Sequence, residues 1–228
     1  MGKAIIKNIY SLLVAFIIAM IFRTFIYEPF NIPSGSMKPN LEVGNYIFAS
    51  KFHYGYSRYS IPFGFNIFEG RIFELNQPKR GDVIIFKLPL DKSTNYIKRL
   101  IGLPGDKVIV KNGIIYINGE ELKQQPNGEY IDNDYNNPVA IAQYIEHMDN
   151  KEYLILDMIE NSPIDNTYEY TVPEDHYFFM GDNRDNSQDS RSIQKVGYVH
   201  KDLIIGKATI KLFPEGFSNI FKLFAYIK

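Results

Sequence analysis

The sequence contains no cysteine and no tryptophan among its 228 residues. Without cysteine the chain forms no disulfide bond, offers no thiolate to a zinc ion and has no cysteine nucleophile. Its charges nearly cancel, because 25 basic residues are balanced by 26 acidic ones. Net charge therefore provides no attraction to nucleic acid, and we expect no nucleic-acid partner.

What the chain does contain favours a β-rich globular protein. Hydrophobic residues make up 45% of the sequence, which supplies a core and argues against disorder. The aromatic residues are 17 Tyr and 17 Phe, and they are accompanied by 16 Gly and 12 Pro. This composition favours short strands and turns over long helices.

One apolar run stands apart at the N-terminus. Residues 8–22 are uncharged, and the run continues past Arg23 to Tyr27. A helix over residues 8–27 would be about 30 Å long, enough to cross a bilayer. A cleaved secretory signal is the alternative, but no small-x-small cleavage site follows the apolar core. We therefore expect residues 1–27 to be an uncleaved membrane anchor.

The charges that flank this span indicate its orientation. Lys3 and Lys7 precede the apolar run, which favours a cytoplasmic N-terminus. Arg23 and Lys38 follow the core of the run and weaken the asymmetry. Charge alone therefore favours one orientation without fixing it.

Beyond residue 28 the pattern predicts β structure. Asn112-Gly113 and Asn118-Gly119 lie between apolar runs and are typical of two-residue hairpin turns. The expected strands cover residues 46–49, 83–87, 96–101, 107–110, 114–118, 139–145, 153–159 and 177–180.

The order of the motifs suggests how the chain is divided. Residues 123–137 are polar and indicate an exposed excursion. We expect residues 28–110 and 173–215 to form a β catalytic core, and residues 111–172 a variable inserted cap region. In residues 216–228 the apolar positions at helical spacing would lie on a membrane surface or on the protein's own core. Those positions are Phe217, Ile220, Phe221, Phe224 and Ile227.

Three segments carry residues suited to chemistry. In residues 33–39, two prolines hold the backbone on either side of Ser36, and Gly35 permits a close approach. This arrangement would present a serine nucleophile rigidly, although most Ser-rich turns are only turns.

The second segment, residues 96–106, contains Lys98. Strand alternation places Lys98 on one face with Tyr96 and Leu100, and Arg99 on the other. A buried lysine has a lowered pKa and serves as a base near neutral pH. The alternative is a lysine that faces solvent on an edge strand.

The third segment, residues 181–191, is dense in Asp, Asn, Ser and Arg. Such side chains fix a site by hydrogen bonds. A calcium loop is the alternative, but Arg184 and Arg191 place cations among the oxygen ligands.

Together and in this order, the anchor and the three segments resemble the bacterial type I signal peptidases, a Ser-Lys protease family. The resemblance also covers residues 28–30, 80–83 and 206–208. It implies a mostly β protein, in which a single transmembrane helix precedes an antiparallel β-sheet catalytic domain with a β-rich insertion. It implies a serine endopeptidase that needs no metal or organic cofactor.

The resemblance also implies roles for individual residues. Ser36 would be the nucleophile, Lys98 the general base and Ser34 an oxyanion donor beside the backbone N–H of Ser36. Ser187 would hydrogen-bond the lysine. The structural supports would be Asp182, Asp189, Arg99 and Arg191. Two shallow apolar subsites would be lined by Phe30, Ile32, Met37, Leu41, Ile47, Ile85, Tyr96 and Ile97.

The implied substrates are exported preproteins, cut after small-x-small (Ala-x-Ala) sites at the end of the signal peptide. The implied location is the bacterial inner (plasma) membrane. The lipid bilayer would then be a partner, and the catalytic domain would lie on the outer (periplasmic or extracellular) face.

Departures from the family pattern are mild. Asn40 stands where many members have Thr, Asn45 where many have Asp, and residues 191–197 are longer than is common. The second transmembrane helix of some members has no counterpart before Ser36.

Three other readings compete with a Ser-Lys protease. A Ser-His-Asp triad would need one of the four histidines, at positions 53, 147, 176 and 200. A self-cleaving repressor would need a DNA-binding domain and no membrane span. A membrane-tethered β-rich binding module would leave Ser36 and Lys98 unexplained.

Overall fold

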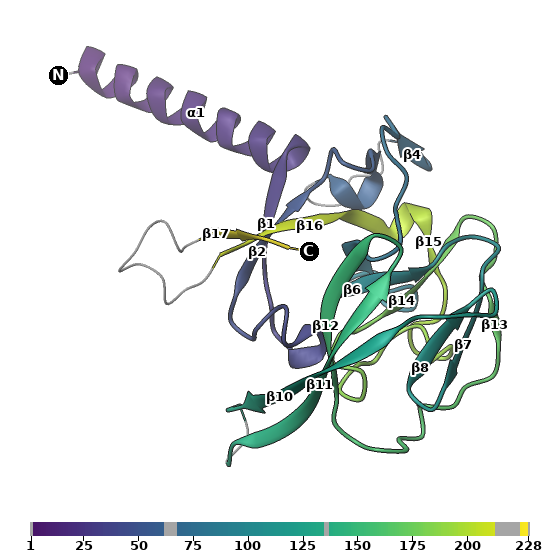
Figure 1. The fold of residues 1–228 in the computed structure, drawn as a ribbon. Helices are drawn as coiled ribbons and strands as arrows, with labels where there is room; N and C mark the ends of the chain where they lie inside the picture. Colours follow the sequence, from purple (N-terminus) through teal and green to yellow (C-terminus); the bar gives the residue numbers. More distant parts are fainter. Residues whose placement is uncertain (1, 62–67, 135–136, 213–223, 228) are drawn as a thin grey trace.

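The structure is a computed structural model that describes residues 2–61, 68–134, 137–212 and 224–227. Helix α1 (Gly2–Phe25) projects from a β-rich body (Figure 1). Its segment Ile5–Phe25 has a mean hydropathy of 2.2, and none of it is buried against the body. By length and composition this helix is able to cross a membrane, as the sequence predicts.

The body is built mainly from antiparallel strands, which confirms the mostly β prediction. The largest sheet has the spatial order β1, β2, β16, β5, β6, β14, β15, and β17 pairs with β16. Its strands are β1 (Tyr27–Asn31), β2 (Tyr46–Ser50), β5 (Val83–Lys87), β6 (Asn95–Gly102), β14 (His176–Met180), β15 (Val199–His200), β16 (Ile204–Leu212) and β17 (Phe224–Tyr226).

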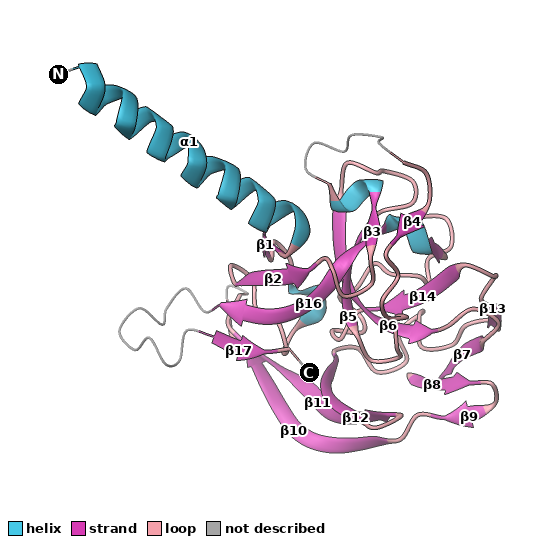
Figure 2. Ribbon diagram, turned by 90° about the horizontal axis from the view of Figure 1, so that it is seen from above, coloured by secondary structure: helices cyan, strands magenta, loops and turns pink. Residues whose placement is uncertain are grey.

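Three smaller sheets complete the body. In Figure 2 the three-stranded sheet runs along the side of the molecule away from α1. It consists of β10 (Gln124–Asp132), β11 (Val139–Met148) and β12 (Lys151–Asp157). Another contains β13 (Tyr170–Thr171), β7 (Lys107–Lys111), β8 (Ile114–Ile117) and β9 (Glu120–Glu121). The last pairs β3 (Tyr56–Ser57) with β4 (Arg71–Ile72). Short 3-10 helices are η1 (Gly35–Met37), η2 (Arg58–Ser60) and η4 (Lys201–Leu203).

Both predicted hairpin turns are present. Asn112 and Gly113 have φ values of 50° and 77°, and Asn118 and Gly119 have 54° and 86°. Positive φ at both central positions is what a type I′ turn requires. The two turns connect β7 to β8 and β8 to β9.

Residues 123–137, predicted to be an exposed excursion, are mostly exposed where the structure describes them, but they form a strand rather than a loop. Residues 124–132 form β10, which pairs antiparallel with β11 and carries an irregularity between Pro126 and Glu129. The strand lies at the edge of its sheet and is mostly exposed, so polar side chains do not oppose pairing.

The predicted helical face near the C-terminus is only partly visible. Phe217, Ile220 and Phe221 lie outside the described residues. The described residues 224–226 form strand β17 rather than a helix, because the backbone there bonds along β16.

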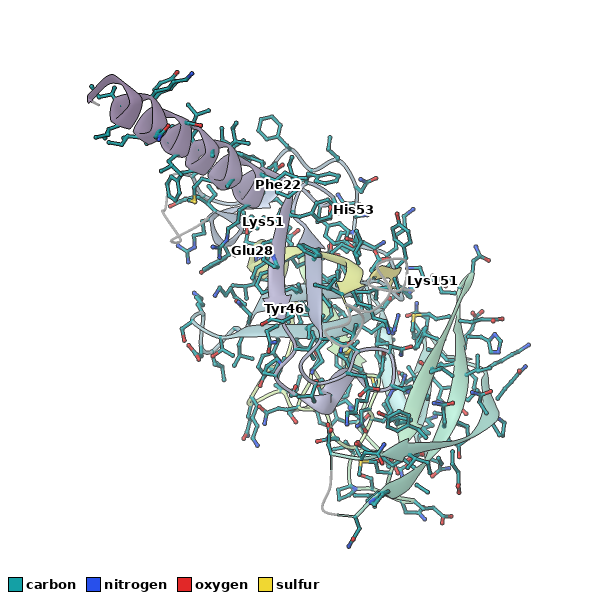
Figure 3. All side chains as sticks on the ribbon, turned by 90° about the vertical axis from the view of Figure 1, so that its left-hand side faces the viewer. Phe22, Glu28, Tyr46, Lys51, His53 and Lys151 are labelled. Carbon is teal, nitrogen blue, oxygen red and sulfur yellow. The ribbon has the colours of Figure 1, made fainter. Side chains whose placement is uncertain are left out.

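An ion pair joins β1 to the residue that follows β2, close to the end of α1. Lys51 Nζ lies 2.6 Å from Glu28 Oε2, and the Lys51 side chain is 1% exposed. Figure 3 shows both side chains on the side of the sheet toward Phe22. Burial lowers the pKa of Lys51, and Glu28 opposes that shift. The pair fixes the point where α1 enters the body.

Candidate active site

Ser36 and Lys98 meet inside the main sheet although 62 positions separate them in the chain. Ser36 lies in η1, just after β1, and is 7% exposed. Lys98 lies within β6 and is 4% exposed. The Lys98 Nζ donates a hydrogen bond to Ser36 Oγ. The structure thus brings together the two residues expected to be nucleophile and base.

Burial favours the neutral form of Lys98. It lowers the pKa of Lys98 from 10.5 to about 8, against the opposing charges of Asp189 and Asp182 and with help from the cation of Arg191. The ring of Tyr96 lies 5.4 Å from Nζ. With a pKa near 8, a substantial fraction of the lysine is neutral at physiological pH and able to accept a proton.

Ser34 lies beside the pair. Its Oγ is 3.4 Å from Ser36 Oγ, and its extended backbone precedes η1. Both serines line a cavity of about 640 Å³, together with Lys98. The remaining wall is Pro33, Thr94, Asn95, Tyr96, Ile97, Ile164, Asp185, Asn186, Ser187, Gln188 and Ser192. A polypeptide entering this cavity would meet all three polar groups.

The segment after β14 holds the turn that carries Ser36. The backbone N–H of Asn183 donates to Ser36 O at 3.1 Å, and its side-chain amide donates to Gly35 O at 3.2 Å. A Cβ on Gly181 would lie 2.5 Å from Ser36 O and 2.2 Å from Ser187 Oγ. Only glycine leaves room for this contact.

The four residues expected to support the site form two buried ion pairs. Arg99 donates to both carboxylate oxygens of Asp182 at 2.7 Å. Arg191 donates to both oxygens of Asp189 at 2.9 Å. Burial would raise the pKa of Asp189, but the charge of Arg191 outweighs it and the pKa is lowered. Asp189 therefore stays ionised close to Lys98.

Ser187 occupies the expected place without the expected bond. It lines the cavity of Ser36, and its Oγ is buried. Among the described residues this hydroxyl has no hydrogen bond of ordinary geometry, so the bond to Lys98 that the resemblance implies is not formed in this structure.

The eight predicted subsite residues fall into three places. Tyr96 and Ile97 line the cavity of Ser36. Phe30 lines a neighbouring cavity of about 440 Å³ at the end of α1. The other five lie within one hydrophobic cluster and are at most 2% exposed; they are Ile32, Met37, Leu41, Ile47 and Ile85.

Three residues near the site bind partners in the region 111–172, and the sequence did not predict these contacts. Lys38 Nζ lies 2.6 Å from Asp132 and 2.5 Å from Asp134. Asn40 donates to Leu154 O and to Asp182, both at 2.7 Å. Arg184 donates to Glu146 at 2.8 Å in a fully buried pair. No local pattern reveals such partners, because each lies far away in the chain.

None of the histidines lines the cavity of Ser36. The rings of His176 on β14 and His200 on β15 meet edge to face with centroids 5.0 Å apart, and His147 lies 3.3 Å from Glu152. A Ser-His-Asp triad therefore has no base at Ser36 among the described residues. Within the same part of the chain, no group of three or more His, Cys, Asp or Glu is placed to hold a metal ion.

Comparison with known proteins identifies the family. A family described as signal peptidase, peptidase S26, matches residues 5–213. The chain belongs to this family. It is accordingly a serine peptidase, and the resemblance drawn from the sequence motifs is confirmed.

Several relatives are similar over most of their length. Signal peptidase I of Rickettsia typhi is 40% identical over 216 residues, which cover 91% of this chain and 80% of that protein. Signal peptidase I of Rickettsia conorii is 42% identical over 200 residues, covering 84% and 73%. A crystal structure of a signal peptidase I from Enterococcus faecalis V583 is 27% identical, with a TM-score of 0.37, and covers 60% of this chain and all of that one.

Proposed function

We propose that this peptidase is a membrane-anchored endopeptidase that removes N-terminal signal peptides from exported preproteins, with Ser36 as nucleophile and Lys98 as general base. The observation that carries the proposal is the bond from the buried Lys98 amine to Ser36 Oγ inside a cavity. The relatives named signal peptidase I support the substrate class.

The proposed reaction uses groups of this chain alone. Neutral Lys98 takes the proton from Ser36 Oγ as the oxygen attacks the scissile carbonyl. Ser34 Oγ and the backbone N–H of Ser36 donate to the resulting oxyanion. The ammonium of Lys98 then protonates the departing amine. Water, deprotonated by Lys98, hydrolyses the acyl-enzyme ester, and the proton returns to Ser36.

Three polar residues would keep the reacting pair in place. Asp182 forms an ion pair with Arg99, and Asp189 forms one with Arg191. Neither carboxylate forms a direct ion pair with Lys98. Ser187 lines the same cavity, and we expect its hydroxyl to orient the lysine amine when substrate is bound.

The cavity wall supports a preference for small residues before the cut. Tyr96 and Ile97 line it beside Lys98 and occupy volume that a large substrate side chain would need. Ala-x-Ala sites fit such a wall, because alanine adds only a methyl group.

The anchor supports an orientation across the bacterial plasma membrane. With α1 spanning the bilayer and Lys3 and Lys7 at its start, the N-terminus would be cytoplasmic and the body would lie on the outer face. A signal peptide held in the same membrane would end close to Ser36.

The test is cleavage of a preprotein by the full chain in detergent or liposomes. Ser36→Ala and Lys98→Ala should each abolish cleavage, and the double variant should be no worse than either single one, because the two residues act as one unit. Lys107→Ala, an exposed lysine on β7, is the matched control. A chelator should leave the rate unchanged.

Two outcomes would contradict the proposal. Substantial turnover by Lys98→Ala, or loss of turnover on replacing one histidine, would favour a triad. Preprotein binding by the wild type without any cleavage would favour the membrane-tethered binding module.

A further inference from the structure

The cavity at the end of α1 adjoins the cavity of Ser36. Its volume of about 440 Å³ is within the range of about 300–1,000 Å³ that is usual for binding sites. Met20 and Arg23 contribute to its wall from the last turns of α1, and Asn95 lines both cavities. We call this space the α1 cavity. It is continuous with the catalytic site at one end and with the candidate membrane span at the other.

The wall of the α1 cavity carries more positive than negative charge. Within the part of the chain that the structure describes, its one acidic side chain is Glu28. Both oxygens of that carboxylate are occupied, since Oε1 lies 3.1 Å from Arg23 and Oε2 lies 2.6 Å from the buried Lys51 (Figure 3). Lys87 and Lys92 also line the cavity, and among the described residues neither forms an ion pair. Two cations of the wall therefore have no counter-ion.

The α1 cavity lies along the route that a signal peptide would take. On β6, Asn95 is three residues before Lys98, and it pairs with Lys87 on β5. Strand residues are about 3.3 Å apart, so Asn95 lies about 10 Å from Lys98 along β6. A signal peptide that leaves the membrane beside the end of α1 must cover this distance to reach Ser36. Its last residues before the cut would therefore pass the α1 cavity.

We infer that the α1 cavity binds the stretch of the signal peptide that joins its apolar core to the cut, and that Lys87 and Lys92 make the cavity discriminate against positive charge in that stretch. The inference rests on the function proposed above. An extended chain would pass Asn95 about three residues before the cut, so the stretch concerned is about four to six residues before the cut.

Charge explains the direction of this preference. A substrate lysine in the α1 cavity would meet the two ammonium groups of Lys87 and Lys92, and like charges repel. A substrate glutamate at the same place would be attracted to both. Preproteins whose signal peptide is uncharged or acidic in this stretch should therefore be the better substrates.

The test uses one preprotein made with Glu, Gln or Lys at the fifth residue before the cut, and the full chain in a non-ionic detergent. The ratio of kcat/KM for the Glu form to that for the Lys form measures the discrimination. For the wild type at low ionic strength we expect a ratio of about 10. The ratio should fall to about 2 or less in Lys87→Gln/Lys92→Gln, and it should shrink for the wild type as salt is added.

Lys107→Gln/Lys111→Gln is the matched control. It also removes two exposed lysines, both from β7, which lines neither cavity. This variant should keep the wild-type ratio. A second control places Glu, Gln or Lys at the fifth residue after the cut, where the wild type should show no comparable preference.

The outcomes separate this inference from the proposed function. Equal ratios for the wild type and Lys87→Gln/Lys92→Gln, or the same fall in the β7 control, would overturn the inference, while the cleavage itself would uphold the proposed function. An equal preference after the cut would also overturn it, because the charge would then act over the whole body rather than in the α1 cavity. No cleavage of any of the three preproteins would contradict the proposed function and the inference with it.

Discussion

The Cα of Gly181 lies against the carbonyl oxygen of Ser36, so close that an added Cβ would stand 2.5 Å from it. The contact joins the end of β14 to the turn that presents the nucleophile. It also brings Gly181 against Ser187 Oγ. Any side chain at position 181 must therefore displace the nucleophile, Ser187 or both.

Gly181→Ala should lower the rate of preprotein cleavage by about 100-fold, because a shift of roughly 1 Å in a reacting group costs that much. The full chain should still fold. Gly128→Ala is the control for a strained but uncrowded position, because Gly128 lies within β10 with a φ of 77° and a Cβ added there would meet no other atom within 4 Å. Similar rates for the two variants would show that Gly181 does not position Ser36.

The pH dependence of cleavage should report the amine of Lys98. Its pKa of about 8 means that the neutral form is lost as pH falls below that value. The rate should therefore rise with pH to a plateau above about 8. A profile measured for kcat on a preprotein, in detergent at constant ionic strength, checks this. A rate that keeps rising up to about pH 10.5 would mean that Lys98 retains its ordinary pKa.

The same pKa makes a second measurement possible, on stability. Folding lowers the pKa of Lys98, so the buried ammonium destabilises the folded state below pH 8, and this cost disappears as pH rises from 8 to 10.5. The free energy of unfolding of the wild type, relative to Lys98→Met, should therefore increase by about 3 kcal/mol across that range. Denaturant titrations of both proteins at each pH provide the difference. No change would contradict the burial of a titrating amine.

The two acids that bind Lys38 should differ in importance. The Asp132 side chain is 2% exposed and that of Asp134 is 58% exposed. Asp132→Ala should lower the free energy of unfolding by about 3 kcal/mol, because it leaves the buried ammonium of Lys38 with only the exposed carboxylates of Asp134 and Glu42. Asp134→Ala should cost no more than about 1 kcal/mol.

Lys38 lies two residues from Ser36, so Asp132→Ala should also slow cleavage, whereas Asp134→Ala should leave its rate near that of the wild type. Equal effects of the two substitutions, on stability and on rate, would show that the β10 end of the sheet does not position the nucleophile.

Substrate preference should respond to Ile97 and Ile32 at different costs. Ile97 lines the cavity of Ser36, whereas Ile32 is 2% exposed within the core. Ile97→Ala should improve acceptance of valine before the cut, relative to alanine, by about 10-fold or more. Ile32→Ala should lower the free energy of unfolding by about 2 to 5 kcal/mol, independently of its effect on substrate preference. An unchanged preference in both variants would contradict the subsite assignment.

The local features of this fold are predictable because they depend on neighbouring residues. The strand at residues 83–87 and the two Asn-Gly turns follow from an apolar run and from residues that tolerate positive φ. Strand β10 escapes prediction because its polar sequence pairs at a sheet edge, where burial imposes no alternation. Its partner β11 is predictable only because that strand is apolar.

The site is built from residues that lie far apart in the chain, and no local sequence pattern shows that they meet. Lys98 looks like any strand lysine until Ser36 is placed beside it, and only the resemblance to a family joins the two. Lys38 and Asp132 are 94 positions apart in the chain, and no sequence motif indicates that they bind each other. For Ser187 the opposite holds. The resemblance implies a hydrogen bond between Ser187 and Lys98, but the folded chain does not form it.

Three consecutive residues after β14 each bond a different part of the chain. Asp182 receives Arg99 from β6, Asn183 donates to Ser36 O on η1, and Arg184 donates to Glu146 on β11. Removing or adding one residue here would shift all three contacts out of register together. Redesign of this segment is therefore restricted to exchanges of one side chain for another, whereas the exposed bend of β10 around Gly128 offers a place to lengthen the chain or to fuse a tag.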